Sequence, residues 1–362
     1  MLKNPFHRTM PVPPLPLPPP TLKERVHSFW EWYRGAAARF AAMLEGRQGA
    51  ALQTEVAAKV DALLPGMAWA FGPGAESGGH SFTLTPEGNA DRRFIAAHWR
   101  QQAPALEKWT FHASRQPSEL HRRDHCIEMG GLKFAADAIW LVPRVNESLC
   151  RVDLAVWHPL FDRIPAPVQE NVTLLWLEEM LGEDAVSNWI GDTTAGDRLT
   201  EAMPLTELPE YLAELQSRRG WKKPPPHQSY CLYRMPESSP HSAMLRGDIV
   251  GGNSCHIDLV RSYPLATNPL EAFGAEYMML AFPTSLLPRG VEVDHRGLLE
   301  DALSAALVAE ASGTVLGGAL GTKYTYIDLL LYDAENSRRL VRKVMAGTYT
   351  AATFRLLPFV DR

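Results

Sequence analysis

The chain has 362 residues and a formal net charge of −5 at pH 7, and 46% of its residues are hydrophobic. This composition is sufficient for one or two hydrophobic cores, and the length favours two domains. The 36 Lys and Arg residues do not outnumber the 41 Asp and Glu residues, so a dense basic face for nucleic acid is not expected. No apolar run is long enough to cross a bilayer, and no membrane partner is expected. Four scattered cysteines without a CxxC motif indicate reduced thiols in a cytoplasmic protein: Cys126, Cys150, Cys231 and Cys255.

Proline dominates residues 1–20, above all between Pro11 and Pro20. Proline fixes φ and removes a backbone donor, so this segment is predicted to be an extended polyproline II arm. The prolines also interrupt the apolar stretch that a secretory signal peptide would need. Two PxxP spacings are compatible with a ligand for an aromatic groove, and a stiff tether is the alternative interpretation.

Residues 21–217 are predicted to form an N-terminal α+β domain that combines a helix pair with a mixed α/β sheet. Thr21 and Glu24 have the spacing of a capping box at the start of the first helix. An apolar stripe that includes Trp30 and Tyr33 then continues to about Leu44, which favours core packing for both rings. Further along the chain, helices and short strands alternate irregularly: a second helix before Pro65, a hairpin over 67–85, helices over 89–103, 167–181 and 205–215, and strands over 109–114, 135–142 and 148–157.

Residues 218–228 are basic and rich in proline, which is typical of a linker, and residues 229–362 are predicted to form a second domain. From Tyr277 onward the expected order is strand, helix, strand, strand, helix, strand. This β-α-β-β-α-β order predicts a ferredoxin-like domain. Its predicted elements are strands over 277–282, 314–320, 324–332 and 352–359 and helices over 297–311 and 336–345, preceded by strands over 228–234 and 248–254.

Several short segments resemble known bacterial proteins. Phe29–Gly35, Gly79–Gly88, Lys108–Pro117 and Leu181–Gly191 resemble, in that order, segments of a group of uncharacterised bacterial two-domain proteins. Val315–Asp333 resembles the ferredoxin-like domain of the bacterial regulators of ribonuclease E activity of type B. The resemblance implies an adaptor-like bacterial protein that acts by binding another protein, and it implies no catalytic residue.

The strand predicted over 324–332 carries the main candidate binding residues. Alternation places Ile327, Leu329 and Leu331 on the face that should meet the C-terminal helices. The opposite face carries tyrosines around one carboxylate: Tyr324, Tyr326, Asp328 and Tyr332. Exposed tyrosines suit a protein-binding surface, because the ring buries area while the hydroxyl remains hydrogen-bonded. The alternative is that the N-terminal domain covers this face within the same chain.

The densest group of potential metal ligands is His121, His125 and Cys126, with His112 nearby in sequence. Histidines at i and i+4 share a helix face, and Zn²⁺ binds imidazole and thiolate. However, the segment lacks the glutamate of the HExxH motif, and two arginines between the histidines oppose a cation. A solvated loop is therefore favoured, and a metal-dependent hydrolase using these three residues is the alternative function.

Other motifs do not combine into a catalytic set. Cys255 and His256 are adjacent on a predicted strand end, where their side chains should point to opposite faces. The glycines over 313–321 lead into a strand, so they indicate a β-bulge or close strand approach instead of a phosphate loop. The acid pairs Glu178/Glu179 and Glu183/Asp184 are not expected to converge with other reactive groups. Four residues form a basic helical face, which is a solvated surface or a contact for an anionic patch on a partner: Arg338, Arg339, Arg342 and Lys343, with Arg355 nearby.

The sequence therefore predicts a non-catalytic module that binds another protein, such as an inhibitor or an immunity protein. No cofactor is expected. Binding of RNA through the open sheet is a weaker alternative, and it should be weak and sensitive to salt.

Overall fold

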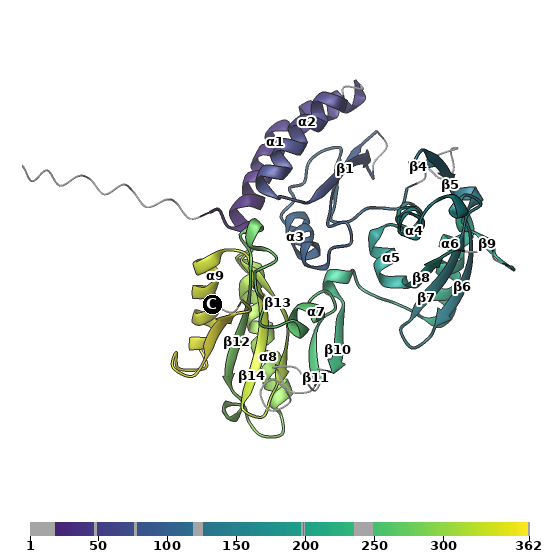
Figure 1. The fold of residues 1–362 in the computed structure, drawn as a ribbon. Helices are drawn as coiled ribbons and strands as arrows, with labels where there is room; N and C mark the ends of the chain where they lie inside the picture. The colour runs from purple at the N-terminus through teal and green to yellow at the C-terminus, as the bar shows by residue number, and fades with distance from the viewer. Residues whose placement is uncertain are drawn as a thin grey trace, which may run out of the picture.

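The computed structural model describes residues 19–46, 49–75, 78–118, 126–196, 198, 200–234 and 249–360. Helices and several β-sheets are mixed along the chain, so the predicted α+β class is confirmed at that level (Figure 1). Most of the proline-rich arm predicted for residues 1–20 lies outside the described residues. No helix within the described residues combines the length and the hydropathy that a membrane span requires.

The N-terminal body contains three helices and a three-stranded sheet. The predicted capping box is confirmed: the Thr21 backbone N–H donates to the Glu24 carboxylate (2.8 Å), and the Glu24 N–H donates to the Thr21 hydroxyl. The sheet has two antiparallel strands, and its third strand runs parallel to the second because a helix crosses between them. The elements are α1 (Leu22–Glu45), α2 (Gly49–Leu63), β1 (Ala68–Pro73), β2 (His80–Thr85), α3 (Ala90–Gln101) and β3 (Trp109–His112).

Aromatic side chains fill the core of this body. Trp30 of α1 stacks on Trp99 of α3 with ring centroids 4.6 Å apart, and its indole N–H donates to the Trp99 carbonyl (2.9 Å). Tyr33 is fully buried and packs against rings of β2 and β3. The interpretation of Trp30 and Tyr33 as core residues is therefore confirmed, because the apolar stripe of α1 is the side that faces the sheet.

Residues 126–221 form a middle body with a hydrophobic core of its own. Its four-stranded sheet has the order β8-β7-β6-β9, and Leu154, Trp176 and Leu212 lie in the core between the sheet and its helices. A hairpin, β4-β5, precedes this sheet. The elements are β4 (Cys126–Met129), β5 (Leu132–Ala135), β6 (Trp140–Asn146), β7 (Arg151–Trp157), α4 (Ala166–Leu181), α5 (Glu183–Trp189), β8 (Ile190–Ala195), β9 (Met203–Pro204) and α6 (Leu208–Arg219).

The C-terminal part is built on a six-stranded sheet with the order β10-β11-β13-β14-β12-β15, in which all neighbouring strands are antiparallel. Its first two strands extend the sheet on the side of β13, and β15 forms the other edge. The elements are β10 (Tyr230–Arg234), β11 (Ile249–Asn253), α7 (Ile257–Arg261), β12 (Glu276–Pro283), α8 (Glu292–Ala309), β13 (Gly313–Leu320), β14 (Tyr324–Leu331), α9 (Ala334–Ala346) and β15 (Arg355–Pro358).

Helices α8 and α9 cover one face of this sheet, as the alternation along β14 predicts. Ile327, Leu329 and Leu331 are fully buried in one cluster with leucines of α8 and with Val341 of α9. This assignment of the inner face is confirmed, since side chains two residues apart on a strand share one face.

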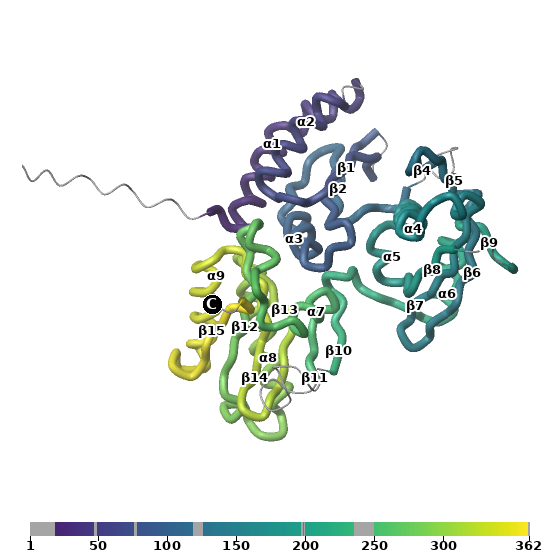
Figure 2. Tube along the Cα trace, in the orientation of Figure 1, coloured from purple at the N-terminus to yellow at the C-terminus, as the bar shows by residue number. Residues whose placement is uncertain are grey.

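The N-terminal body packs on the opposite face of the C-terminal sheet. One continuous hydrophobic cluster joins side chains of α1 and α3 to Leu316, Leu330 and Phe359. The start of α1 is also tied by backbone hydrogen bonds, from the Lys23 N–H to the Tyr332 carbonyl (2.9 Å) and from the Leu22 N–H to the Gly274 carbonyl (3.2 Å). In Figure 2 the purple start of α1 lies at the top of the C-terminal sheet, and the teal middle body lies to one side of both. The hydrophobic core is thus shared between the two ends of the chain, while residues 126–221 have a separate core.

Glycines allow β11 and β13 to approach closely. Gly317 has a φ of 143°, and a Cβ atom there would collide with the backbone of Gly251 and Gly252. The pairing of β13 with β14 shifts register between Val315 and Gly317. The predicted β-bulge is confirmed, because only glycine tolerates both this φ and this contact.

Candidate functional site

The N-terminal body covers one end of the tyrosine-bearing face that was predicted to bind a partner. Tyr332 is 5% exposed and its ring lies against His98 of α3, with centroids 4.3 Å apart. Asp328 is 1% exposed and Tyr326 is half-buried, so only Tyr324, at 39%, is well exposed. Tyr332 and Asp328 therefore cannot meet a partner in this fold, which corrects that part of the predicted surface. The alternative interpretation, cover by the N-terminal part of the same chain, describes the packing at Tyr332, whereas Asp328 lies against His256 of the C-terminal part.

A row of buried polar groups crosses this covered face. The Tyr277 hydroxyl donates to Oδ1 of Asp91 on α3 (2.7 Å), and the His256 ring stacks on the Tyr277 ring at 5.3 Å. Nε2 of His256 lies 3.8 Å from Oδ2 of Asp328. Burial raises the pKa of Asp91, and the hydrogen bond from Tyr277 opposes this shift. These contacts link α3 to the C-terminal sheet.

Cys255 lies next to this row but is not activated as a nucleophile. Its thiol donates to the Pro226 carbonyl (3.5 Å), and burial raises its pKa. A catalytic cysteine needs the opposite shift, toward a thiolate stabilised by a neighbouring imidazolium. The sequence-based rejection of a Cys255–His256 pair therefore agrees with the thiol's environment.

The predicted metal ligands are only partly within the described residues. His121 and His125 lie outside them, Cys126 begins β4 and is half-buried, and His112 lies on β3. Within the described ranges, no group of three or more His, Cys, Asp and Glu side chains has the geometry of a metal site. The site of the hydrolase alternative is therefore not tested, because two of its three residues lie outside the described ranges.

A buried ion network joins the N-terminal body to the corner between α4 and α5, contrary to the expectation that these acids do not converge. The Glu183 carboxylate accepts hydrogen bonds from the Thr85 hydroxyl (2.6 Å) and the Gly88 N–H (2.8 Å). The Arg93 guanidinium lies 3.6 Å from Glu183 and 2.9 Å from Asp184. Glu183 and Arg93 are both buried. Arg93, Glu183 and Asp184 each have a partner of opposite sign, so the network holds the two bodies together.

Glu178, on the last turns of α4, lies beside this network. Burial and the neighbouring Glu183 carboxylate raise its pKa, and Arg115 opposes the shift. Arg115 lies 4.0 Å from Glu178 and forms a closer ion pair with Glu87 (2.8 Å). Sequence reasoning missed this junction because its parts are about a hundred positions apart. The only local signal was an acid pair directly after Gly182 at a helix start.

The contact between His98 and Tyr332 should make stability depend on pH. Burial, assisted by the Lys23 charge, lowers the pKa of His98 to about 4, so the folded state holds the neutral imidazole. Unfolded His has a pKa near 6.5, so the unfolded state alone gains a proton as pH falls below that value. We expect the free energy of unfolding to drop by about 2 kcal/mol between pH 7.5 and pH 5 through this group.

Urea titrations at both pH values test this expectation. His98→Phe, which keeps a ring against Tyr332, should remove this share of the pH dependence. The matched control, replacement of the exposed His27 by Gln, should retain it. Equal pH dependence in the wild type and in His98→Phe would contradict the assignment.

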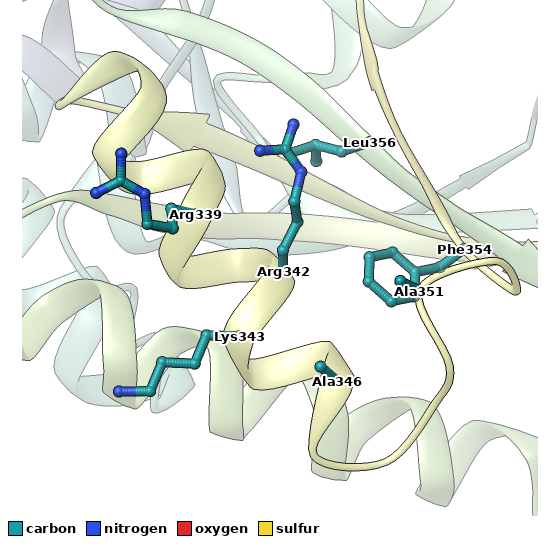
Figure 3. A pocket seen from close by; sticks show the side chains of 7 residues that line it. All are labelled: Arg339, Arg342, Lys343, Ala346, Ala351, Phe354 and Leu356. Atoms are coloured by element: carbon teal, nitrogen blue, oxygen red, sulfur yellow. The ribbon is translucent and has the colours of Figure 1, made fainter.

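A groove with an apolar floor lies between α9 and β15, at the edge of the six-stranded sheet. Its volume is about 520 Å³. Phe354 and Leu356 provide the floor, with Ala346 and Ala351 at one end (Figure 3). Arg342 extends from α9 between Arg339 and Phe354, whereas Lys343 points away from Phe354. The basic helical face identified in the sequence therefore borders an apolar hollow.

The cations of this groove, which we call the α9–β15 groove, are incompletely neutralised. Arg342 forms an ion pair with Glu335 (2.7 Å), and Arg338 contacts Glu335 (3.2 Å) and Glu276. Among the described residues, no carboxylate lies within ion-pair distance of two further cations that line the groove, Arg339 and Lys343, whereas Arg355 is not one of the lining residues. The hydrogen bonds from Arg342 and Arg338 lower the pKa of the exposed Glu335 carboxylate. The groove thus combines exposed apolar area with unpaired positive charge, which suits binding and not proton transfer.

Comparisons with protein-family models, with curated proteins and with solved structures give no match for this chain.

Proposed function

We propose that this chain is a non-catalytic module that binds another protein, and that the α9–β15 groove is its contact surface. The observation that carries the proposal is the apolar floor of Phe354 and Leu356 beneath unpaired cations at an open sheet edge. Exposed apolar area bordered by charge is typical of protein-binding surfaces. The predicted tyrosine surface contributes only its exposed end, at Tyr324.

We further propose that residues 276–358 form a ferredoxin-like unit. The strand order β13-β14-β12-β15, with α8 and α9 on one face, supports this assignment. In this proposal β11 and β10 extend the unit, and the N-terminal body occupies the face that such a sheet leaves open. The resemblance to regulators of ribonuclease E activity supports action as an inhibitor or immunity-type protein in the cytoplasm.

Isolation of the intact chain from its native host tests the proposed function. With an affinity tag on the chain, we expect a second protein to elute with it in a fixed molar ratio on size exclusion. A lysine-reactive cross-linker should connect this protein to Lys343 more often than to the exposed Lys222, which directly follows the middle body. Elution of the chain alone, at low salt and native concentration, would show that the proposal is wrong.

A further inference from the structure

We infer that the α9–β15 groove binds an acidic peptide segment of the partner, with an apolar side chain between acidic residues. This inference rests on the proposed function and specifies the chemistry of the ligand. Three features of the groove support it: the size of the apolar floor, the balance of charge around it, and the open edge of β15.

The floor has room for one or two apolar side chains. Phe354 is 9% exposed and Leu356 is half-buried, so both belong to the sheet's helix-covered core and present one side to the groove. A hollow of about 520 Å³ lies within the range of sites that hold small ligands or side chains. Covering this area removes apolar surface from water, at about 25 cal/mol per Å². The ligand therefore needs an apolar or aromatic anchor.

The charges around the floor select acidic neighbours for this anchor. Arg339 and Lys343, which line the groove, have no carboxylate partner among the described residues, although the whole chain carries a net charge of −5. The negative net charge of the chain repels an acidic segment, whereas the cations of the groove attract it. This difference favours one docking position. In the absence of a ligand, Arg342 already forms an ion pair with Glu335. Because that ion pair is exposed and therefore weak, an incoming carboxylate can replace it at little cost.

The geometry also limits the length of the recognised segment. Arg339 and Ala346 are seven residues apart on α9, which corresponds to about 10 Å along the helix. An extended peptide covers this distance with about three residues. Beyond Leu357 the edge of β15 is closed, because Pro358 has no N–H and the Leu265 N–H donates to the Phe359 carbonyl (2.9 Å). The contact is therefore short, with acidic residues directly beside the anchor.

Nucleic acid suits this groove less well than an acidic peptide. Phosphate contacts gain nothing from the Phe354–Leu356 floor, and Glu335 and Glu276 lie among the cations, where they repel a phosphate backbone. Single-stranded RNA would also need several exposed aromatic rings for stacking, and Phe354 is the groove's single lining ring. RNA is accordingly included as an outcome of the test and not as the proposed ligand.

Fluorescence anisotropy with the full chain tests the inference. The probe is a labelled peptide with the sequence Gly-Asp-Glu-Asp-Phe-Leu-Glu-Asp-Glu-Gly, and we expect saturable binding that weakens as salt increases. Replacing Phe-Leu by Ser-Ser, or the acids by Gln, should each weaken binding. Arg339→Glu combined with Arg342→Glu should weaken it about tenfold or more. The matched control reverses the charge of two exposed arginines outside the groove, Arg218→Glu and Arg289→Glu. It should bind the acidic probe as the wild type does.

Three results would overturn the inference. The first is that the acidic probe does not bind at a protein concentration of about 1 mM. The second is that the groove variant and the control variant lose the same amount of affinity for the probe. The third is that the peptide with Gln in place of its acids binds as tightly as the acidic probe. Binding of a labelled RNA hexamer that the groove variant abolishes would assign the groove to phosphates instead. Thermal melting of each variant shows that it is folded. If the groove variant still recovers the native partner in full, both the inference and the assignment of the groove as the contact surface are wrong, while binding of another protein stands; if no partner exists, the whole proposed function is wrong.

Discussion

Replacement of Tyr332 by Ala is expected to lower the free energy of unfolding by about 4 kcal/mol. The Tyr332 ring is buried between the C-terminal sheet and His98 of α3, and its removal would leave a cavity in the cluster shared by the two ends of the chain. The surrounding backbone is held by the hydrogen bond from the Lys23 N–H to the Tyr332 carbonyl, so the cavity cannot easily collapse. Chemical denaturation followed by tryptophan fluorescence measures the change.

Tyr324→Ala provides the matched control for this prediction. It removes the same side-chain type at the start of β14, at a position that is 39% exposed, whereas Tyr332 directly follows the end of this strand. We expect the free energy of unfolding to fall by less than about 1 kcal/mol in this variant. Similar losses at the two positions would show that the N-terminal body does not cover the Tyr332 end of β14.

Glu183→Gln is expected to lower the free energy of unfolding by about 3 kcal/mol, because it removes the charge of one partner in a buried ion network. The amide retains the shape of the side chain, but it removes the charge that faces the buried Arg93 guanidinium at 3.6 Å. It also replaces a carboxylate oxygen that accepts the Thr85 hydroxyl at 2.6 Å. Asp184 remains at 2.9 Å from Arg93, which limits the loss.

Hydrogen exchange locates the effect of this substitution, and unfolding in urea measures its size. We expect faster exchange at the corner between α4 and α5 and around Gly88, with little change in the six-stranded sheet, because Glu183 connects these two regions. Glu170→Gln, at an exposed position on α4, is the control and should have no measurable effect. An unchanged stability of Glu183→Gln would mean that the network does not hold the two bodies together.

Local patterns in the sequence predicted most of the secondary structure. The capping box at Thr21, the period of α1 and the alternation along β14 depend on neighbours within a few residues, and each agrees with the structure. Short elements were missed where this signal is weak. The hairpin β4-β5 and helix α5 have four and seven residues per element, too few for a period to be recognised.

The assignment of faces and junctions required information that local patterns lack. Alternation correctly separated Leu329 from Tyr332, but it does not identify what covers the Tyr332 face. That cover comes from α1 and α3, which lie at the other end of the chain. Likewise, the residues around Glu183 meet only because two separate bodies pack together. Long-range contacts of this kind are set by the packing of whole elements and not by propensity.

Only one of the two features of the α9–β15 groove, its basic side, could be predicted from the sequence. The spacing of Arg338, Arg339, Arg342 and Lys343 on a helix predicts a basic face. The apolar floor could not be predicted, because Phe354 and Leu356 follow a loop whose path decides which side of α9 they reach. The proposed ligand chemistry therefore depends on the structure more than on the pattern of charges.

The shared core of the chain's two ends has a consequence for biosynthesis. A ribosome releases α1 and α3 early, whereas Leu330 and Phe359, which complete their packing, emerge last. At ordinary rates of translation this interval is on the order of half a minute. During that time the middle body can complete the folding of its own core. The aromatic side chains of α1 still lack the C-terminal residues that complete their packing. The nascent polypeptide is therefore expected to be a client of chaperones that shield apolar segments at the exit tunnel.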